Sequence, residues 1–535
     1  MSLEFLLDLP EFRTLVEKLK KGEGCLHLSG LIPEARAYFY ALLAGQIDRP
    51  LVIVEPQAWA LEEIKQEIEN LLGFFSIKRQ VESLPALSAD PYLEVPVPLE
   101  MVASRLKVLY GLNQGHQPLI LTNLPGLLKK VPRPEDLARS VVRINRGQTL
   151  DRDLLLQQLA DYGYTQEDLV SSAGEYAFRG GIVDIYSVWS KNPVRLEFIE
   201  NQVASIREFD PSTQRSIGRL ESVVIPSLKE YPGGKEFREE FKRQARKREI
   251  GLADLERKIQ LWEEGEILPS FDYYALAASE HFCPLSSYLS NPLFILEEKD
   301  LIEKEWEEQF SDWEKTYDNL VKQRSFALSP AEIFSLDFRQ EIKSKAVCIQ
   351  DLSEESEQPA LQLGFQSVPR FDNRIPFFLQ YLKKRQEERD ICYIFLSNPG
   401  KKDRLAHLLR ENDLTVRAVS NVSEKPRGEE INLVEGRLER GFSYPRQKIY
   451  IFAEKDIFTE EKVLISRPSR KVFFSQFQDL KQGDYVVHTE YGVGLFNGLK
   501  KIDLDGQPHD FIELIYRDDD RLLVPVEDLN LVQKF

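Results

Sequence analysis

Apolar residues in the first 120 positions occur in short runs that are separated by amphipathic stretches. Residues 51–55 and 118–122 are apolar-rich runs of strand length, whereas residues 58–72 repeat apolar positions with helical spacing. Residues 25–30 form a further short run, which leads into a helical stretch at 34–43. Strands that alternate with helices predict βαβ units and a mostly parallel sheet.

The pattern changes to a period of two after about residue 124. Residues 181–186 and 194–199 alternate between apolar and polar side chains, and a turn at 200–201 leads into 203–209. Such alternation is typical of an antiparallel sheet with one face in water. We predict a small α+β module that ends near residue 217, followed later by a buried strand at 293–297 that completes the first sheet.

Two charged helices are predicted at 235–265 and 298–325. The second carries an apolar stripe with spacings of three and four residues, which favours packing against its own domain over a groove for a partner. The stripe consists of Trp306, Phe310, Trp313, Tyr317 and Leu320.

A further α/β pattern and then an all-β pattern follow. The α/β pattern has strands at 346–349, 391–395 and 448–452, with helices at 377–388 and 403–411. Residues 466–471 are typical of a flexible linker, although their three bases could contact nucleic acid. Strands at 485–488, 511–516 and 521–525, punctuated by glycines, predict a small β-barrel.

Composition limits the classes of function. The 535 residues include 70 Lys+Arg and 87 Asp+Glu, a net charge of −17. This argues against a chain that mainly binds nucleic acid through its own surface, because phosphate neutralisation needs clustered bases. Four cysteines without a CxxC pair, an acidic N-terminus and the lack of an apolar run near the roughly 20 residues of a membrane span favour a soluble cytoplasmic protein.

The first strand-to-helix turn has the spacing of a P-loop without its chemistry. A P-loop needs GxxxxGK[ST], in which backbone amides and lysine bind phosphate and the hydroxyl binds magnesium. Here Gly30 is retained, but Ala35, Arg36 and Ala37 replace the second glycine, the lysine and the hydroxyl residue. We therefore interpret this loop as degenerate and expect no nucleotide hydrolysis by this chain.

Other catalytic patterns are missing from the sequence. The six histidines show no HExxH or HxH spacing, and there is no GxSxG nucleophile turn. Glu297 and Glu298 follow a strand in the manner of a magnesium-binding motif, but we interpret them as a solvated strand end. We predict no catalytic residues and no metal site.

The strongest motif lies in the inserted module: 174–186 (GEYAFRGGIVDIY), followed by 193–198 (PVRLEF). It closely resembles the module shared by the excision-repair protein UvrB and the bacterial transcription-repair coupling factors, which docks onto UvrA. Alternation places Arg195 and Glu197 on one strand face, and Arg179 shares that face if its strand pairs alongside. The resemblance implies that these three residues bind UvrA; without it, an ordinary solvated face is the favoured interpretation. Ala177 and Gln166 stand where UvrB has arginines.

The C-terminal motif, 483–498 (GDYVVHTEYGVGLFNG) with 521–526 (RLLVPV), resembles the CarD-like RNA polymerase-interacting domain of the coupling factors. In that family the domain binds the polymerase β subunit, largely through a strand edge, as in β-augmentation. The resemblance implies that Lys500, Lys501, Ile502 and Leu504 form this edge, with Ile502 as the apolar contact; the alternative is that Ile502 is a core residue.

The resemblance extends over nearly the whole chain and is closer to the coupling factors than to UvrB. Full-length members add an ATP-dependent DNA translocase, so we expect ATP and Mg²⁺ to be cofactors of that motor and not of this chain. We expect an adaptor in bacterial nucleotide excision repair that contacts UvrA and RNA polymerase, contacts DNA only weakly or indirectly, and has no membrane partner. The alternative is a UvrB-like nucleotide- or DNA-binding repair enzyme.

The predicted fold class is multidomain α/β: a degenerate P-loop-like parallel-sheet domain with an inserted α+β UvrB-like module, a second α/β domain, and a small C-terminal β-barrel of the CarD/Tudor-like kind. The predicted segments are 1–123 and 218–335 for the first domain, 124–217 for the UvrA-docking module, 336–456 for the second α/β domain, 457–474 for a linker and 475–535 for the polymerase-interacting domain.

Overall fold

The computed structural model describes residues 3–22, 26–93, 97–263, 268, 270–350, 361–419, 430–458, 485–488, 492–504, 507–516, 521–525 and 532–534. The chain divides into two compact units, residues 1–459 and 460–535. No helix in the described ranges is both long and apolar enough to cross a membrane.

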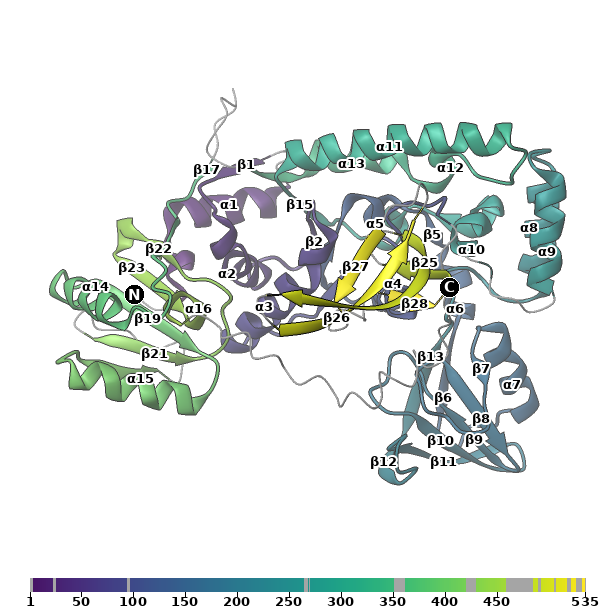
Figure 1. Ribbon diagram of the computed structural model, residues 1–535, viewed down its shortest axis with the longest axis horizontal. Helices are drawn as coiled ribbons and strands as arrows, with labels where there is room; N and C mark the ends of the chain where they lie inside the picture. The colour runs from purple at the N-terminus through teal and green to yellow at the C-terminus, as the bar shows by residue number, and fades with distance from the viewer. Residues whose placement is uncertain are drawn as a thin grey trace. The chain divides into compact units, whose positions relative to one another are not determined.

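The first α/β domain is built on a sheet of seven parallel strands in the order β17–β1–β16–β15–β2–β4–β3 (Figure 1). The predicted parallel sheet is therefore confirmed, and so is the return of 293–297 to it. The strands are β1 (Leu26–Ser29), β2 (Leu51–Val54), β3 (Val81–Leu84), β4 (Leu119–Thr122), β15 (Leu293–Glu297), β16 (Val347–Gln350) and β17 (Leu361–Gln362).

Helices cover both faces of this sheet, which explains its continuous apolar runs. Along β2, Leu51 and Ile53 face one core, whereas Val52 and Val54 face the other. The first core is shared with α1 (Pro10–Lys21), α2 (Pro33–Ala44) and α3 (Leu61–Phe74), and the second with α4 (Leu99–Asn113), α11 (Lys299–Lys322) and α13 (Leu336–Lys345).

One strand lies in a different sheet from the one predicted. Strand β16, which we assigned to the second α/β domain beginning at 336, lies between β1 and β15 in the first sheet, and β17 follows on its edge. A buried apolar run of four residues carries no information about which sheet it joins, because its pairing partners are distant in sequence. The predicted boundary at 336 is therefore wrong for these strands.

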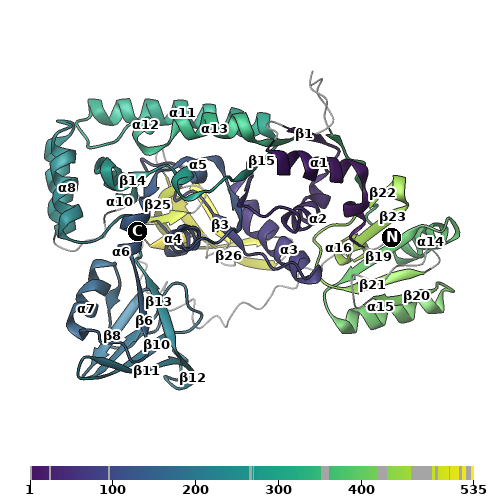
Figure 2. The same ribbon diagram turned by 180° about the vertical axis from the view of Figure 1, so that it is seen from behind.

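The aromatic stripe of α11 packs against its own domain, as predicted. Trp306 and Trp313 are almost fully buried, and Trp313 stacks on Phe334 with ring centroids 4.8 Å apart. Phe241 of α8 (Lys235–Arg246) and Ile259 of α9 (Leu252–Glu263) also join this second core, and Figure 2 shows α8 at one end of α11.

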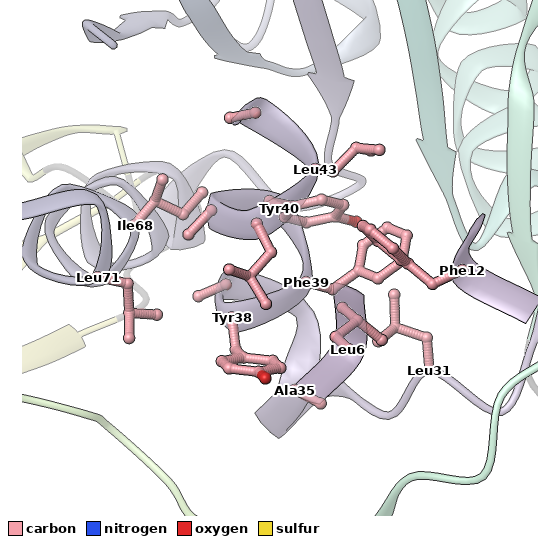
Figure 3. Close-up of a cluster of buried hydrophobic side chains, with 14 of the residues drawn as sticks. Leu6, Phe12, Leu31, Ala35, Tyr38, Phe39, Tyr40, Leu43, Ile68 and Leu71 are labelled. Atoms are coloured by element: carbon pink, nitrogen blue, oxygen red, sulfur yellow. The ribbon is translucent and has the colours of Figure 1, made fainter. Parts of the chain in front are cut away.

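Helix α2 is buried on nearly all sides. Figure 3 shows its residues Tyr38, Phe39 and Tyr40 among side chains from neighbouring segments, including Leu6 and Phe12. The Tyr38 ring lies 5.0 Å from that of Phe442, which belongs to the second α/β domain. The two α/β sheets therefore share one hydrophobic core.

The second α/β sheet has six strands in the order β18–β22–β23–β19–β21–β20. Its central strands are parallel, and an antiparallel pair forms one side. The strands are β18 (Gln366–Ser367), β19 (Ile391–Leu396), β20 (Val416–Val419), β21 (Ile431–Glu435), β22 (Phe442–Tyr444) and β23 (Ile449–Ala453), and the helices are α14 (Ile375–Glu387) and α15 (Pro399–Glu411).

The inserted module contains a six-stranded sheet in the order β12–β11–β10–β9–β8–β7, joined to the first domain by the pair β6–β13. All pairs are antiparallel except β7–β8. The predicted end near residue 217 falls inside β12, so the module is longer than predicted. Its elements are β6 (Val141–Asn145), α7 (Arg152–Asp161), β7 (Thr165–Gln166), β8 (Glu175–Arg179), β9 (Ile182–Ile185), β10 (Val194–Ile199), β11 (Gln202–Phe209), β12 (Ser216–Leu220) and β13 (Ser222–Pro226).

The second compact unit contains a five-stranded antiparallel sheet in the order β27–β26–β25–β24–β28. The all-β character of this unit agrees with the prediction; its closure into a barrel stays a prediction. The linker predicted at 457–474 lies outside the described residues from 459 onward. The strands are β24 (Tyr485–His488), β25 (Gly492–Leu504), β26 (Gln507–Ile515), β27 (Arg521–Pro525) and β28 (Val532–Lys534).

Candidate functional site

One face of the module's sheet packs against α7, and the opposite face is exposed except where Ala177 and Phe209 are buried against Val170. On the covered face, Leu196 of β10 and Ile206 of β11 pack with Leu155 and Leu159 of α7. Residues that alternate with these point to the other side, which we call the open face. It carries the three residues predicted to bind UvrA together with neighbours, eight residues from five strands: Arg179, Ile182, Asp184, Arg195, Glu197, Ser205, Arg207 and Arg219.

The register places the predicted residues together. Arg179 of β8 pairs with Ile182 of β9, and Ile182 pairs with Glu197 of β10. Arg195 lies two positions before Glu197 on the same strand, so all three predicted side chains share the open face. Their common face was inferred from alternation alone, on the condition that β8 pairs alongside, and the structure meets that condition.

Arg195 is held by its own module. Its Nε and Nη2 donate to the two carboxylate oxygens of Asp184 at 2.7 and 2.8 Å, and Nη2 also donates to Gln214 Oε1 at 3.2 Å. The guanidinium lies over the Phe209 ring, 4.6 Å from its centroid. The hydrogen bonds with Asp184 raise the pKa of Arg195 above its ordinary value. This arginine therefore has little bonding capacity left for a partner.

Arg179 and Glu197 are more available. Arg179 is exposed, and its Nη2 donates to the carbonyl oxygen of Asp168 at 2.8 Å. Glu197 accepts from Ser205 Oγ at 2.6 Å and from Arg207 Nη2 at 3.2 Å, and its side chain keeps 34% exposure. Arg179 is thus the predicted residue best placed to contact another protein.

Two apolar side chains are exposed beside these charges. Ile182 is 37% exposed and is in register with both Arg179 and Glu197. Ile199, two positions after Glu197 on β10, is 69% exposed. These two side chains add apolar area beside the charged groups, and protein interfaces combine apolar and polar surface.

Sequence reasoning missed Arg207 and Arg219. Both lie on the open face, since Arg207 is in register with Arg195 and with Arg219. Arg207 follows the same two-residue alternation that revealed Arg195, so the pattern contained this signal. Arg219 lies beyond the predicted end of the module, and nothing in the sequence placed its strand beside β11.

The module is anchored to the first domain by a buried charge cluster. Arg105 of α4 donates from Nη2 to Glu230 Oε1 at 3.0 Å and from Nε to Glu230 Oε2, and Lys129 Nζ donates to the same Oε1 at 2.9 Å. All three side chains are 0–1% exposed. Burial alone would raise the pKa of Glu230, but the charges of Arg105 and Lys129 outweigh it and lower that pKa. Trp189 adds a bond from Nε1 to the carbonyl of Ala103 at 2.8 Å.

The degenerate P-loop is filled by the chain's own side chains. Gly30 adopts a positive φ of 72°, and a Cβ there would lie 2.0 Å from the carbonyl oxygen of Leu363. Arg36 pairs with Glu297 at the end of β15 and donates to Glu298 Oε1 at 3.2 Å, and Tyr40 donates to Glu297. Ala35 and Ala37 are buried in the core.

The expectation that Glu297 lies on a solvated strand end is wrong. Its side chain is 0% exposed, because Arg36 and Tyr40 from α2 cover it. Burial alone would lower the pKa of Arg36, but the charge of Glu297 reverses this effect and raises it. An arginine paired with a buried carboxylate occupies the place where a P-loop lysine would meet phosphate. Among the described residues, no group of three or more His, Cys, Asp or Glu could hold a metal ion.

The polymerase-binding residues predicted from sequence lie in the second half of β25. Residues 495–504 of this strand pair with β26, including Lys500 with Phe511 and Ile502 with His509. Strand β24 pairs only with positions 492–495, so among the described strands the other edge of 496–504 has no partner. Lys500 Nζ donates to Glu513 Oε1 at 2.6 Å. The side chains of Lys501, Ile502 and Leu504 lie outside what the structure describes.

Comparison with known proteins agrees with both motifs. Residues 142–231 match the UvrB interaction domain, and residues 480–535 match the CarD-like/TRCF RID domain. The first match extends past residue 217, in agreement with the observed β12 and β13.

Similarity to whole proteins covers almost the entire chain. The transcription-repair-coupling factor of Bacillus subtilis is 26% identical over 99% of this chain, that of Myxococcus xanthus is 27% identical over 98%, and that of Escherichia coli is 26% identical over 98%. The aligned region is 47%, 46% and 46% of those relatives, so the chain spans about half their length. From its first sheet to its C-terminal strands, this chain is therefore homologous to the bacterial transcription-repair-coupling factors and carries their UvrB interaction and CarD-like domains.

Proposed function

We propose that this chain is an adaptor in transcription-coupled nucleotide excision repair, which binds UvrA through the open face of its inserted module and the β subunit of RNA polymerase through its C-terminal sheet. The observation that carries the proposal is the open face itself. Arg179, Ile182 and Glu197 lie side by side on the part of this face that is accessible: Arg179 is exposed, and Ile182 and the Glu197 side chain keep 37% and 34% exposure. The match of residues 142–231 to the UvrB interaction domain supports this assignment.

The contact with UvrA combines charge and apolar surface. Arg179 offers a guanidinium for a bidentate bond with a carboxylate, and Ile182 and Ile199 offer apolar area beside it. Arg195, on the same face, supports this surface by holding Asp184 and covering Phe209.

The contact with RNA polymerase uses the unpaired edge of β25. Backbone N–H and C=O groups on a free edge can pair with a strand of another protein, and side chains beside the edge add specificity. Lys500, Lys501, Ile502 and Leu504 line this half of the strand. The match of residues 480–535 to the CarD-like/TRCF RID domain supports the polymerase as partner.

We propose no nucleotide hydrolysis for this chain and only weak or indirect contact with DNA. The pair formed by Arg36 and Glu297 neutralises, inside the protein, the positive charge that a phosphate would need. This observation disfavours a UvrB-like nucleotide-dependent enzyme as the alternative function.

Binding experiments with both partners test the proposal. The purified chain should capture UvrA and RNA polymerase without ATP. Arg179→Ala should abolish the capture of UvrA and leave the capture of RNA polymerase unchanged. Arg143→Ala is the matched control, because Arg143 is an exposed arginine on β6, outside the six-stranded sheet. Failure of the parent chain to bind UvrA, or full binding by Arg179→Ala, would contradict the assignment.

The contact with RNA polymerase is tested with Ile502→Arg, which should abolish polymerase binding and leave UvrA binding intact. Val493→Arg is its control, since Val493 is a 43% exposed apolar residue in the half of β25 that β24 covers. Polymerase binding that survives Ile502→Arg but not Val493→Arg would move the contact to the other half of the strand.

A further inference from the structure

Three arginines form one row across adjacent strands of the inserted module. Arg195 of β10 is directly opposite Arg207 of β11, and Arg207 is directly opposite Arg219 of β12. Residues that are opposite in an antiparallel pair project from the same side of the sheet, so the row lies on the open face. On its inner side the row ends at Asp184 of β9.

The three like charges lower the stability of the sheet unless nearby carboxylates neutralise them. Like charges directly opposite in a sheet are destabilising. Asp184 binds Arg195 with both of its oxygens. Arg207 makes one bond, at 3.2 Å, to a Glu197 oxygen that also accepts from Ser205. The module's own acids therefore satisfy the inner arginine and only partly satisfy the middle one.

The outer arginine has no such partner. Arg219 is exposed, and among the described residues its side chain makes no hydrogen bond or ion pair. The Nε of Arg207 also has no hydrogen-bond partner there. Unneutralised positive charge thus increases along the row from Asp184 toward the edge of the sheet.

The edge itself is accessible. β12 is the outermost strand of the six-stranded sheet, and Ile217 on it is 57% exposed. Arg219 is exposed on this same strand, so a segment of another protein can approach it from the edge of the sheet.

We propose that Arg207 and Arg219 form a carboxylate-binding site that extends the UvrA-docking face to the free edge of β12 and receives an acidic segment of the docked protein. The inference rests on the proposed docking function and names the chemistry of the partner surface. The partner segment presents at least two carboxylates, with an apolar residue for Ile217. Arg195 completes the row as a positioning residue, because its own charge is already matched by Asp184.

A carboxylate-bearing protein fits this site better than a nucleic acid. Asp184 and Glu197 lie on the same face and would repel a continuous phosphate backbone. Residues 142–231 contain 10 Lys+Arg against 13 Asp+Glu, so the module as a whole is acidic. A short acidic segment can meet the arginines and avoid these acids, whereas a duplex cannot.

Calorimetric titration of the full chain with purified UvrA tests the site. The variant Arg207→Ala/Arg219→Ala should bind at least tenfold more weakly than the parent and should lose part of the salt dependence between 50 and 300 mM NaCl. Arg143→Ala should bind within twofold of the parent. The thermal midpoint of Arg219→Ala should equal or exceed that of the parent, because the substitution removes a like-charge neighbour, whereas a purely structural arginine would lower it.

The outcomes separate this inference from the docking function. If Arg179→Ala loses binding while the double variant binds like the parent, the docking face stands and the carboxylate site is wrong. If the parent does not bind UvrA at all, both are wrong. A 30-base-pair DNA duplex serves as the second titrant, and salt-dependent DNA binding that the double variant loses would identify a nucleic-acid site and overturn the proposal.

Discussion

Arg195 and Asp184 form a two-point ion pair between neighbouring strands, with Nε and Nη2 donating to the two carboxylate oxygens at 2.7 and 2.8 Å. Asp184 is only 8% exposed, and the Arg195 side chain is 24% exposed. The pair is thus a part of the module's construction. The homologous motif singles out Arg195 as a contact residue, but its geometry makes it a support for the contact surface.

Arg195→Ala should therefore destabilise the protein. It leaves the Asp184 carboxylate without its cation and uncovers the Phe209 ring, which should cost about 1–3 kcal/mol. Arg195→Lys should recover only part of this, because an ammonium cannot form the two-point bond. Urea denaturation followed by circular dichroism measures the change.

Arg179→Ala is the matched comparison, since it truncates an exposed arginine on the same face. Its free energy of unfolding should stay within about 0.5 kcal/mol of the parent. If Arg195→Ala were as stable as the parent and still failed to bind UvrA, Arg195 would have to be a direct contact.

The filled loop at Gly30 leads to a second prediction. Glu297→Ala removes the acceptor of Tyr40 and the carboxylate that Arg36 pairs with, and leaves that largely buried guanidinium with the partly exposed Glu298 and the nearby Glu55. Loss of one partner from a buried pair costs about 3–5 kcal/mol. Glu298→Ala, one residue further and 40% exposed, should cost no more than about 1 kcal/mol.

The same variants address nucleotide binding. Calorimetry should show no heat of ATP binding for the parent or for either variant, since none of them creates the lysine and hydroxyl of a P-loop. ATP binding by the parent would contradict the interpretation of the loop as degenerate. A stable Glu297→Ala variant would show that the ion pair is not what holds α2 against β15.

The open face was predictable to the extent that local alternation determines it. Arg195 and Glu197 occupy every second position of one strand, and this places them together whatever the strand pairs with. The position of Arg219 on this face could not be predicted, because its strand joins the sheet through pairing that no local pattern encodes. Strand β16 was assigned to the wrong sheet for the same reason.

The buried ion pair of the degenerate P-loop could not be predicted from the sequence either. Arg36 and Glu297 are 261 residues apart in the chain and meet only because β15 returns to the first sheet after the insertion. In isolation, Arg36 has the features of a residue in the first turn of a helix and Glu297 those of a strand end. Only their contact turns a P-loop-like turn and a magnesium-like strand end into one internal ion pair.

A third prediction concerns pH and the junction of the two α/β sheets. Glu67 of α3 accepts the backbone N–H of Glu439, in the loop after β21, at 3.0 Å. Burial, aided by the charges of Glu439 and Glu63 and opposed by this hydrogen bond, raises the pKa of Glu67 from 4.5 to about 7. Between these values the folded state holds a proton that the unfolded state releases. The contribution of Glu67 to stability therefore falls as pH rises from about 4.5 to 7 and is constant above that.

Glu67→Gln keeps an oxygen for the Glu439 N–H and removes the titration. The variant should match the parent near pH 5 and exceed it at pH 8 by about 1–3 kcal/mol, because the parent must then bury a charge. Urea denaturation at pH 5, 6, 7 and 8 measures the difference. Glu62→Gln is the control, since Glu62 lies on the same helix with a side chain that is 64% exposed, and it should leave the pH dependence unchanged. Parallel pH profiles for Glu67→Gln and the parent would mean that Glu67 is already ionised in the folded protein, and the contact between α3 and the loop after β21 would then have to accommodate a buried charge.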